Sequence, residues 1–195
     1  MKLYDLEASG NCYKVRLFAS LANIPLEIIP VDLPSGAHKE PPFLDMNPLG
    51  QVPVLEDESH VVRDSQAILV YLAGTYGGLA WWPAHAQGQA DIVQWLSFAA
   101  NEVEHSLCAA RLVKKFGQPL DKSAALIKST VVLSLLERHL EHNDWLAMSR
   151  PTIADCAVYP YVVLAPEGDV DLKPYRHVAS WIKRVEELPG YLPKP

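Results

Sequence analysis

The segment Ser9-Gly10-Asn11-Cys12 has residue types and a spacing suited to binding a thiol. It lies between a predicted strand and a predicted helix, so its groups face a helix N-terminus, where unpaired amides and the macrodipole favour an anion such as a thiolate. The spacing is that of a redox Cys-x-x-Cys motif, but Ser9 holds the first position and cannot form the disulfide. Ser9 can instead donate a hydrogen bond to a bound thiolate, or act only as a helix N-cap. For Cys12, burial as a small apolar residue is favoured.

Pro53 stands at the start of a predicted strand, where a proline is unusual because it has no amide to donate to the ladder. We predict a cis Val52-Pro53 bond, against the alternative of an ordinary trans proline at a strand start. The backbone of Val52 would then face outward at the sheet edge, where its amide and carbonyl can pair with an extended peptide.

Asp64 and Ser65 stand where a predicted hairpin meets the next helix. Asp64 could bind the ammonium of an amino-acid head group, while the Ser65 hydroxyl and nearby amides bind its carboxylate. The alternative is helix capping, for which both residue types are preferred. Thr152 and Asp155 have the spacing of a capping box, and we expect both to be structural. Replacing Asp155 should therefore impair folding more than chemistry.

The elements that position the first of these residues alternate between strand and helix. Polar-apolar alternation and helical spacing predict a strand, a helix, a second strand parallel to the first, a hairpin and another helix. Their ranges are Lys2–Leu6, Cys12–Ala22, Leu26–Val31, Val52–Leu55 with His60–Arg63, and Ser65–Tyr76, and a polar, proline-rich connection spans Pro34–Pro48.

Everything after the break at Gly77-Gly78 is predicted to be helical. A linker at Leu79–Pro83 precedes helices at Gln89–Phe116, Asp121–His142, Thr152–Leu164 and Pro174–Leu188. This order predicts an α/β plus all-α protein. Residues 1–78 would form a thioredoxin-like domain with a mixed four-stranded sheet, and residues 84–195 a C-terminal helical bundle.

Composition and charge exclude several classes of function. With 17 basic and 23 acidic residues the net charge is −6, which argues against a surface for nucleic acid or anionic membranes. The longest apolar stretch, Cys156–Pro166, is well short of the roughly 20 residues that cross a bilayer. The scattered cysteines form no disulfide framework or zinc site, and His139 and His142 lack carboxylate partners for a metal. We expect a soluble, cytoplasmic protein without a bound metal.

Several segments, in their order along the chain, resemble the cytosolic glutathione S-transferase family nearly from end to end. They are Ser9–Arg16, Asn47–Leu55, Arg63–Ile68, Pro151–Asp155 and Val185–Tyr191. Ser9 resembles the catalytic serine of the serine-type, theta- and zeta-like bacterial classes. Zeta-class isomerases have a cysteine at the position of Asn11, and this departure weakens an assignment as a maleylacetoacetate isomerase.

The resemblance implies a glutathione site in the first domain. Its residues would be the catalytic hydroxyl of Ser9, Asn11 for a second hydrogen bond near the sulfur, Gln51 and the Val52 backbone for the cysteinyl part, Asp64 and Ser65 for the γ-glutamyl end, and His38 near the glycyl carboxylate. The second domain would line the electrophile pocket, around Glu104, Cys108 and Arg111. Members of the family are typically homodimers, and they need no metal or other cofactor because glutathione is the co-substrate.

The resemblance leaves alternative functions open. The leading hypothesis is attack of the glutathione thiolate on a small hydrophobic electrophile. A second hypothesis is a glutathione-dependent peroxidase, thiol-disulfide reductase or isomerase, in which Cys12 or glutathione itself carries any redox step. A third is a non-catalytic binding protein that has kept the fold, because function resides in the site and not in the fold.

Overall fold

A mixed four-stranded sheet forms the first part of the chain, in the order β2-β1-β3-β4. The computed structural model describes all residues from Met1 to Pro195. The strands are β1 (Lys2–Asp5), β2 (Glu27–Pro30), β3 (Val54–Asp57) and β4 (His60–Arg63). As predicted, β1 is parallel to β2, and β3 and β4 form an antiparallel hairpin. The hairpin also pairs with β1 through an antiparallel contact of β3, which completes the sheet.

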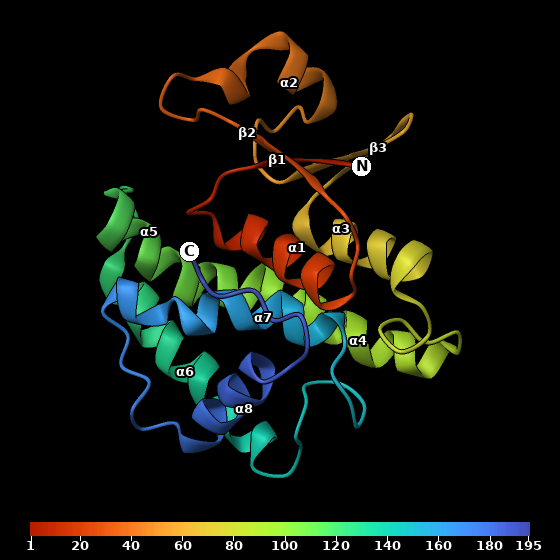
Figure 1. Cartoon of the computed structure of the whole chain (residues 1–195). Coiled ribbons are helices and arrows are strands. Elements are labelled where there is room, and N and C mark those ends of the chain that lie inside the picture. Colours follow the sequence, from red (N-terminus) through yellow and green to blue (C-terminus); the bar gives the residue numbers. More distant parts are fainter.

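The sheet is covered on both faces by helices that the intervening segments form. Leu3 on β1 pairs with Leu55 on β3, and both side chains are fully buried. In Figure 1, α1 (Gly10–Leu21) and α3 (Ser65–Leu72) lie on one side of the strands and α2 (Pro41–Met46) on the other. The predicted polar, proline-rich connection contains α2 and the short helix η1 (Ala37–Lys39), neither of which was predicted. Prolines are tolerated in the first turn of a helix, where their missing amide is not needed.

The second part of the chain is entirely helical, as predicted. Its elements are α4 (Ala86–Phe98), η3 (Ala99–Cys108), α5 (Ala109–Phe116), α6 (Lys122–Leu140), α7 (Ile153–Val163), η4 (Ala165–Gly168) and α8 (Arg176–Glu186), and η2 (Ala73–Gly77) ends the preceding part. Helices α4, η3 and α5 follow one another without a break, so they form the single long helix that the amphipathic pattern indicates. No helix of the structure has both the length and the apolar character that a membrane crossing requires.

Helix α7 lies at the centre of the helical part, and every one of its residues is buried. It packs against α1, so the sheet-bearing part and the helical part share one apolar core that includes Phe18, Leu72 and Val162. Figure 1 shows α7 alongside α1, with the C-terminal tail running beside both. The start of α1 is therefore held between the sheet and the helical part, and this is where the candidate site lies.

Candidate functional site

Ser9 caps the N-terminus of α1 and leaves the first turn of that helix open. Its extended backbone places Oγ where it accepts a hydrogen bond from the Cys12 amide at 3.2 Å. The hydroxyl hydrogen of Ser9 remains free to donate, and the amides of Gly10 and Asn11 donate to no protein group. Unpaired amides at a helix start attract an anion through the positive end of the helix dipole. Both the capping role and an anion-binding role of Ser9 fit this geometry.

The segment before β3 presents unpaired backbone groups. The Val52–Pro53 peptide bond is cis, as predicted. The amide and carbonyl of Val52 have no hydrogen-bond partner in the protein, although the neighbouring Gln51 carbonyl accepts a hydrogen bond from Asn47 Nδ2 at 2.8 Å. The side chain of Gln51 is exposed. The segment can therefore pair with an extended peptide in the manner of an added strand.

Asp64 and Ser65 begin α3 beside the start of α1. Asp64 has a left-handed φ of 76°, and its Oδ1 accepts hydrogen bonds from the Gln66 and Ala67 amides at 2.9 and 3.0 Å. The carboxylate thus caps the helix, and no protein group donates to its other oxygen. Ser65 Oγ donates to Asn11 Oδ1 at 3.3 Å, which joins the starts of the two helices. The structure therefore brings together Asn11 and Ser65, two of the residues predicted to bind glutathione.

His38 lies in η1, on the connection that packs beside the Gly50-Gln51 segment. Its ring is half-buried, and Nδ1 has no hydrogen-bond partner. The neighbouring Lys39 donates from Nζ to the carbonyls of Leu49 and Gly50, at 3.2 and 3.3 Å. Lys39 thereby fixes the connection against the segment that precedes Val52.

Cys12 is buried directly behind the open turn. Its Sγ accepts a hydrogen bond from the Leu6 amide at 3.4 Å, and burial raises the pKa of its thiol to about 12. The residue is therefore a neutral thiol at physiological pH, and only the thiolate is strongly nucleophilic. This geometry agrees with the predicted role of Cys12 as a buried apolar residue.

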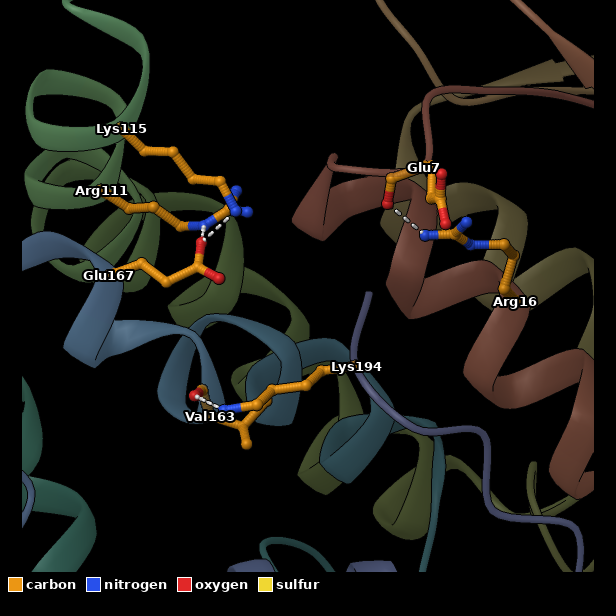
Figure 2. A network of polar contacts seen from close by, with 7 residues as sticks. All are labelled: Glu7, Arg16, Arg111, Lys115, Val163, Glu167 and Lys194. Atoms are coloured by element: carbon orange, nitrogen blue, oxygen red, sulfur yellow. Dashed lines mark hydrogen bonds and ion pairs between the residues drawn. The ribbon is translucent and has the colours of Figure 1, made fainter.

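Two of the residues expected around the electrophile pocket are enclosed by the helical part. Cys108 and Arg111 are buried, and only Glu104 is half-exposed. Arg111 Nε donates to Glu167 Oε2 at 2.6 Å, and Lys115 Nζ contacts the same oxygen at 2.7 Å (Figure 2). Figure 2 also shows Arg16 donating to the Glu7 carbonyl, close to the start of α1.

Lys14 is a buried charged residue that the sequence pattern did not single out. Its side chain is fully buried, and its Nζ has no hydrogen-bond partner. The ammonium lies over the ring of Tyr161, at 5.1 Å from the ring centroid. The only sequence signal for this burial is that Lys14 lies on the same helix face as Phe18 and Leu21. Lysine is seldom fully buried, so the pattern alone favours an exposed side chain.

No group of three or more His, Cys, Asp and Glu side chains converges in a way that could hold a metal ion. Unpaired backbone amides at the start of α1, the free carboxylate oxygen of Asp64 at the start of α3 and the unpaired backbone of Val52 before β3 make up the candidate site. The amides can bind an anion, the carboxylate can bind a cation, and the Val52 backbone can pair with an extended peptide.

Comparisons with known proteins cover nearly the whole chain. Residues 8–75 match the model of the glutathione S-transferase N-terminal domain, and residues 103–189 match that of the C-terminal domain. The chain is 32% identical to glutathione S-transferase 3 of Zea mays, over 98% of this chain and 91% of that protein. It is 34% identical to a maleylacetoacetate isomerase of Rhizobium meliloti, over 87% of this chain and 84% of that protein. A crystal structure of a possible glutathione S-transferase from Rhodopseudomonas palustris has a TM-score of 0.91 at 35% identity, covering 99% of this chain and 97% of that one.

Proposed function

Because the chain belongs to the glutathione S-transferase family, we propose that it binds glutathione and activates the glutathione thiol for attack on a hydrophobic electrophile. Residues 1–78 form the glutathione-binding domain of this proposal, and residues 84–195 line the electrophile pocket. The observation that carries the proposal is the open first turn of α1, where Ser9 keeps a free hydroxyl hydrogen beside unpaired amides. The protein would then belong to the serine-type, theta- and zeta-like bacterial members of the family.

Activation of the thiol follows from the charge that develops on sulfur. A free thiol has a pKa near 8.5, so most glutathione is unreactive thiol at neutral pH. A hydrogen bond from Ser9 and the positive end of α1 both favour the thiolate. Lowering the thiol pKa by about two units corresponds to about 2.7 kcal/mol of differential stabilisation. The proton of the thiol has already passed to solvent when the thiolate forms a carbon–sulfur bond with the electrophile. Either a leaving group departs with its bonding electron pair, or an activated double bond opens and its other carbon takes a proton from solvent.

The remaining contacts follow the length of the tripeptide. The unpaired backbone of Val52 would hold the cysteinyl part in an extended conformation, with Gln51 beside it. The free carboxylate oxygen of Asp64 would accept the γ-glutamyl ammonium, and Ser65 would bind the carboxylate of the same end. His38 would lie near the glycyl carboxylate, and Asn11 would add a hydrogen bond near the sulfur.

Isomerisation is the second candidate function, and a specific observation favours it. The maleylacetoacetate isomerase of Rhizobium meliloti is 34% identical to this chain. Asn11 stands where zeta-class isomerases have a cysteine, which separates this chain from that signature. Assays with an isomerase substrate and with an aromatic electrophile, run on the same preparation, distinguish the two activities. A peroxidase or disulfide reductase that depends on Cys12 is disfavoured by the raised pKa of that thiol.

We also propose that the protein is a cytoplasmic homodimer. An exposed apolar stripe runs along α6 through Ile127, Val131 and Leu135, at the spacing of successive helical turns. Contiguous exposed apolar surface of this kind marks interfaces. Val131→Glu should convert a dimer to a monomer in sedimentation velocity, while Glu141→Gln, on the exposed end of α6, should leave the dimer intact. A monomeric wild-type protein would contradict this part of the proposal.

The direct test measures glutathione binding together with the state of its thiol. Calorimetry would give the affinity, and ultraviolet thiolate absorbance would give the ionised fraction, in wild type and in Ser9→Ala. Ser180→Ala, which removes an exposed hydroxyl on α8, is the matched control. We expect binding in all three proteins and loss of the thiolate signal only in Ser9→Ala. An unchanged thiolate would transfer the role to Asn11, and absence of binding to wild type would refute the proposed function and favour a non-catalytic binding protein.

A further inference from the structure

Lys14 places a positive charge against the first turn of α1. Helical side chains point back toward the helix N-terminus, so the Lys14 ammonium lies near the turn that Gly10 begins. The position of Tyr161 agrees with this placement. A Cβ at Gly10 would meet Cε1 of the Tyr161 ring at 2.6 Å, and the same ring lies 5.1 Å from Lys14 Nζ. One ring therefore touches both the open turn and the buried ammonium.

The groups around this ammonium come from three neighbouring elements. Tyr161 of α7 lies beneath it, and the titratable groups that act on its pKa are Glu104 and Cys108 of η3 and Asp64 at the start of α3. None of them forms a hydrogen bond with Lys14. Glu104 instead accepts a contact from Cys108 Sγ at 3.4 Å, and Asp64 accepts from backbone amides of α3. Glu104 and Asp64 each raise the pKa of Lys14 and so favour its charged form.

This arrangement does not serve the stability of the fold. A buried ammonium without a hydrogen-bond partner is destabilising compared with an apolar side chain of similar shape. Burial accordingly lowers the pKa of Lys14 to about 8, although the carboxylates oppose that effect. A methionine would fill the same space without the cost. Buried charged groups with a shifted pKa are typical of functional sites.

We propose that Lys14 is a positioning residue whose buried ammonium offsets the carboxylate of Glu104 and so favours the thiolate of glutathione at the start of α1. This inference rests on the proposed function. Without Lys14, the Glu104 carboxylate would oppose an anion at the turn where Ser9 donates its hydrogen bond, whereas Asp64 is paired with the γ-glutamyl ammonium in the proposed complex. The proton that leaves the thiol passes to solvent, and no covalent bond to Lys14 is formed.

The test compares variants that change the local charge in opposite directions. Lys14→Met removes the cation, Glu104→Gln removes one carboxylate, and Lys183→Met removes an exposed cation on α8 as the matched control. The readout is the midpoint of the thiolate absorbance of bound glutathione between about pH 5 and 9. At a pH below the titration midpoint of the variant, we expect about tenfold less ionised bound glutathione in Lys14→Met than in wild type. Glu104→Gln should have a larger ionised fraction than wild type, and Lys183→Met should match wild type.

The outcomes separate this inference from the proposed function. Glutathione binding with the wild-type midpoint in Lys14→Met overturns the role of Lys14 and leaves the proposed function standing. Absence of glutathione binding to wild type overturns both. A purely structural role predicts a lower melting temperature of Lys14→Met with an unchanged midpoint, whereas our proposal predicts an equal or higher melting temperature. If Lys14→Met fails to fold, an unchanged midpoint in Glu104→Gln still overturns the proposal.

Discussion

The starts of α1 and α7 use the same kind of capping residue for opposite purposes. At α1, Ser9 accepts one amide, and the two preceding amides of the turn stay unpaired. At α7, Thr152 and Asp155 form a capping box. The Thr152 hydroxyl accepts a hydrogen bond from the Ala154 amide, and the Asp155 carboxylate accepts one from the Thr152 amide. The first helix start is open to a ligand, and the second is closed by the protein itself. A helix N-terminus can bind an anion only where the chain leaves its donors unused.

The two regions also differ in how they bury a charge. Asp155 Oδ1 accepts hydrogen bonds from the Leu146 amide at 3.1 Å and from Trp181 Nε1 at 2.9 Å, in addition to the capping bond on Oδ2. Lys14 is equally buried and has no hydrogen-bond partner. A satisfied buried charge holds its surroundings in place, whereas an unsatisfied one costs stability. Substitutions at the two places should therefore have opposite effects on folding.

Asp155→Ala should produce the largest loss of stability, because it leaves four buried donors on Leu146, Thr152 and Trp181 without an acceptor. We expect about 3–5 kcal/mol less free energy of unfolding, measured by urea denaturation. Glutathione affinity per folded molecule should stay unchanged, since Asp155 lies away from the open turn. Asp171→Ala, which removes an exposed loop carboxylate that accepts from the Lys173 amide, is the control and should change stability little. If Asp155→Ala lowers the free energy of unfolding no more than Asp171→Ala does, the hydrogen bonds of Asp155 do not stabilise the start of α7.

Lys14→Met should change stability in the opposite direction, by up to about 3 kcal/mol at neutral pH. Burial lowers the pKa of Lys14 from 10.5 to about 8. Between these values the unfolded chain keeps a proton that the folded chain has lost, so the wild-type free energy of unfolding rises with pH. The variant should lack this rise and be more stable than wild type below pH 8. Urea unfolding at a series of pH values measures both effects, and a parallel pH dependence in the two proteins would refute the argument.

Local patterns predicted the fold outline and the open helix start, and they failed where tertiary contacts decide. The caps at Ser9 and Asp64 and the cis bond after Val52 could be predicted from the sequence, because capping residues and a proline at a strand start have local causes. The short helix α2 was missed because its prolines suggested an irregular connection. The burial of Lys14 depends on Tyr161, which is remote in sequence and comes beside α1 only through the packing of α7. No local pattern contains that contact.

The two capping hydroxyls give a smaller and sharper comparison. Thr152→Ala should cost about 1–2 kcal/mol of unfolding free energy, because the cap it removes is buried. Ser9→Ala should cost about 1 kcal/mol or less, because Ser9 is half-buried and water can replace its hydroxyl. Only Ser9→Ala should lower the ionised fraction of bound glutathione. Equal losses of thiolate in both variants would show that the effect arises from general destabilisation.

Cys12→Ala should have the smallest effect on activity, although the residue lies in the open turn. The amide of Cys12, and not its thiol, bonds Ser9 Oγ, so the substitution keeps the capping geometry. With its pKa raised to about 12, the thiol supplies almost no thiolate at neutral pH for a redox step. Transferase and peroxidase rates should therefore stay within about twofold of wild type. Cys156→Ala makes the same change within α7 and controls for lost packing. Loss of peroxidase activity in Cys12→Ala alone would show that the start of α1 acts through the Cys12 thiol. The starts of α1 and α7 would then differ by a reactive thiol and not by unpaired donors.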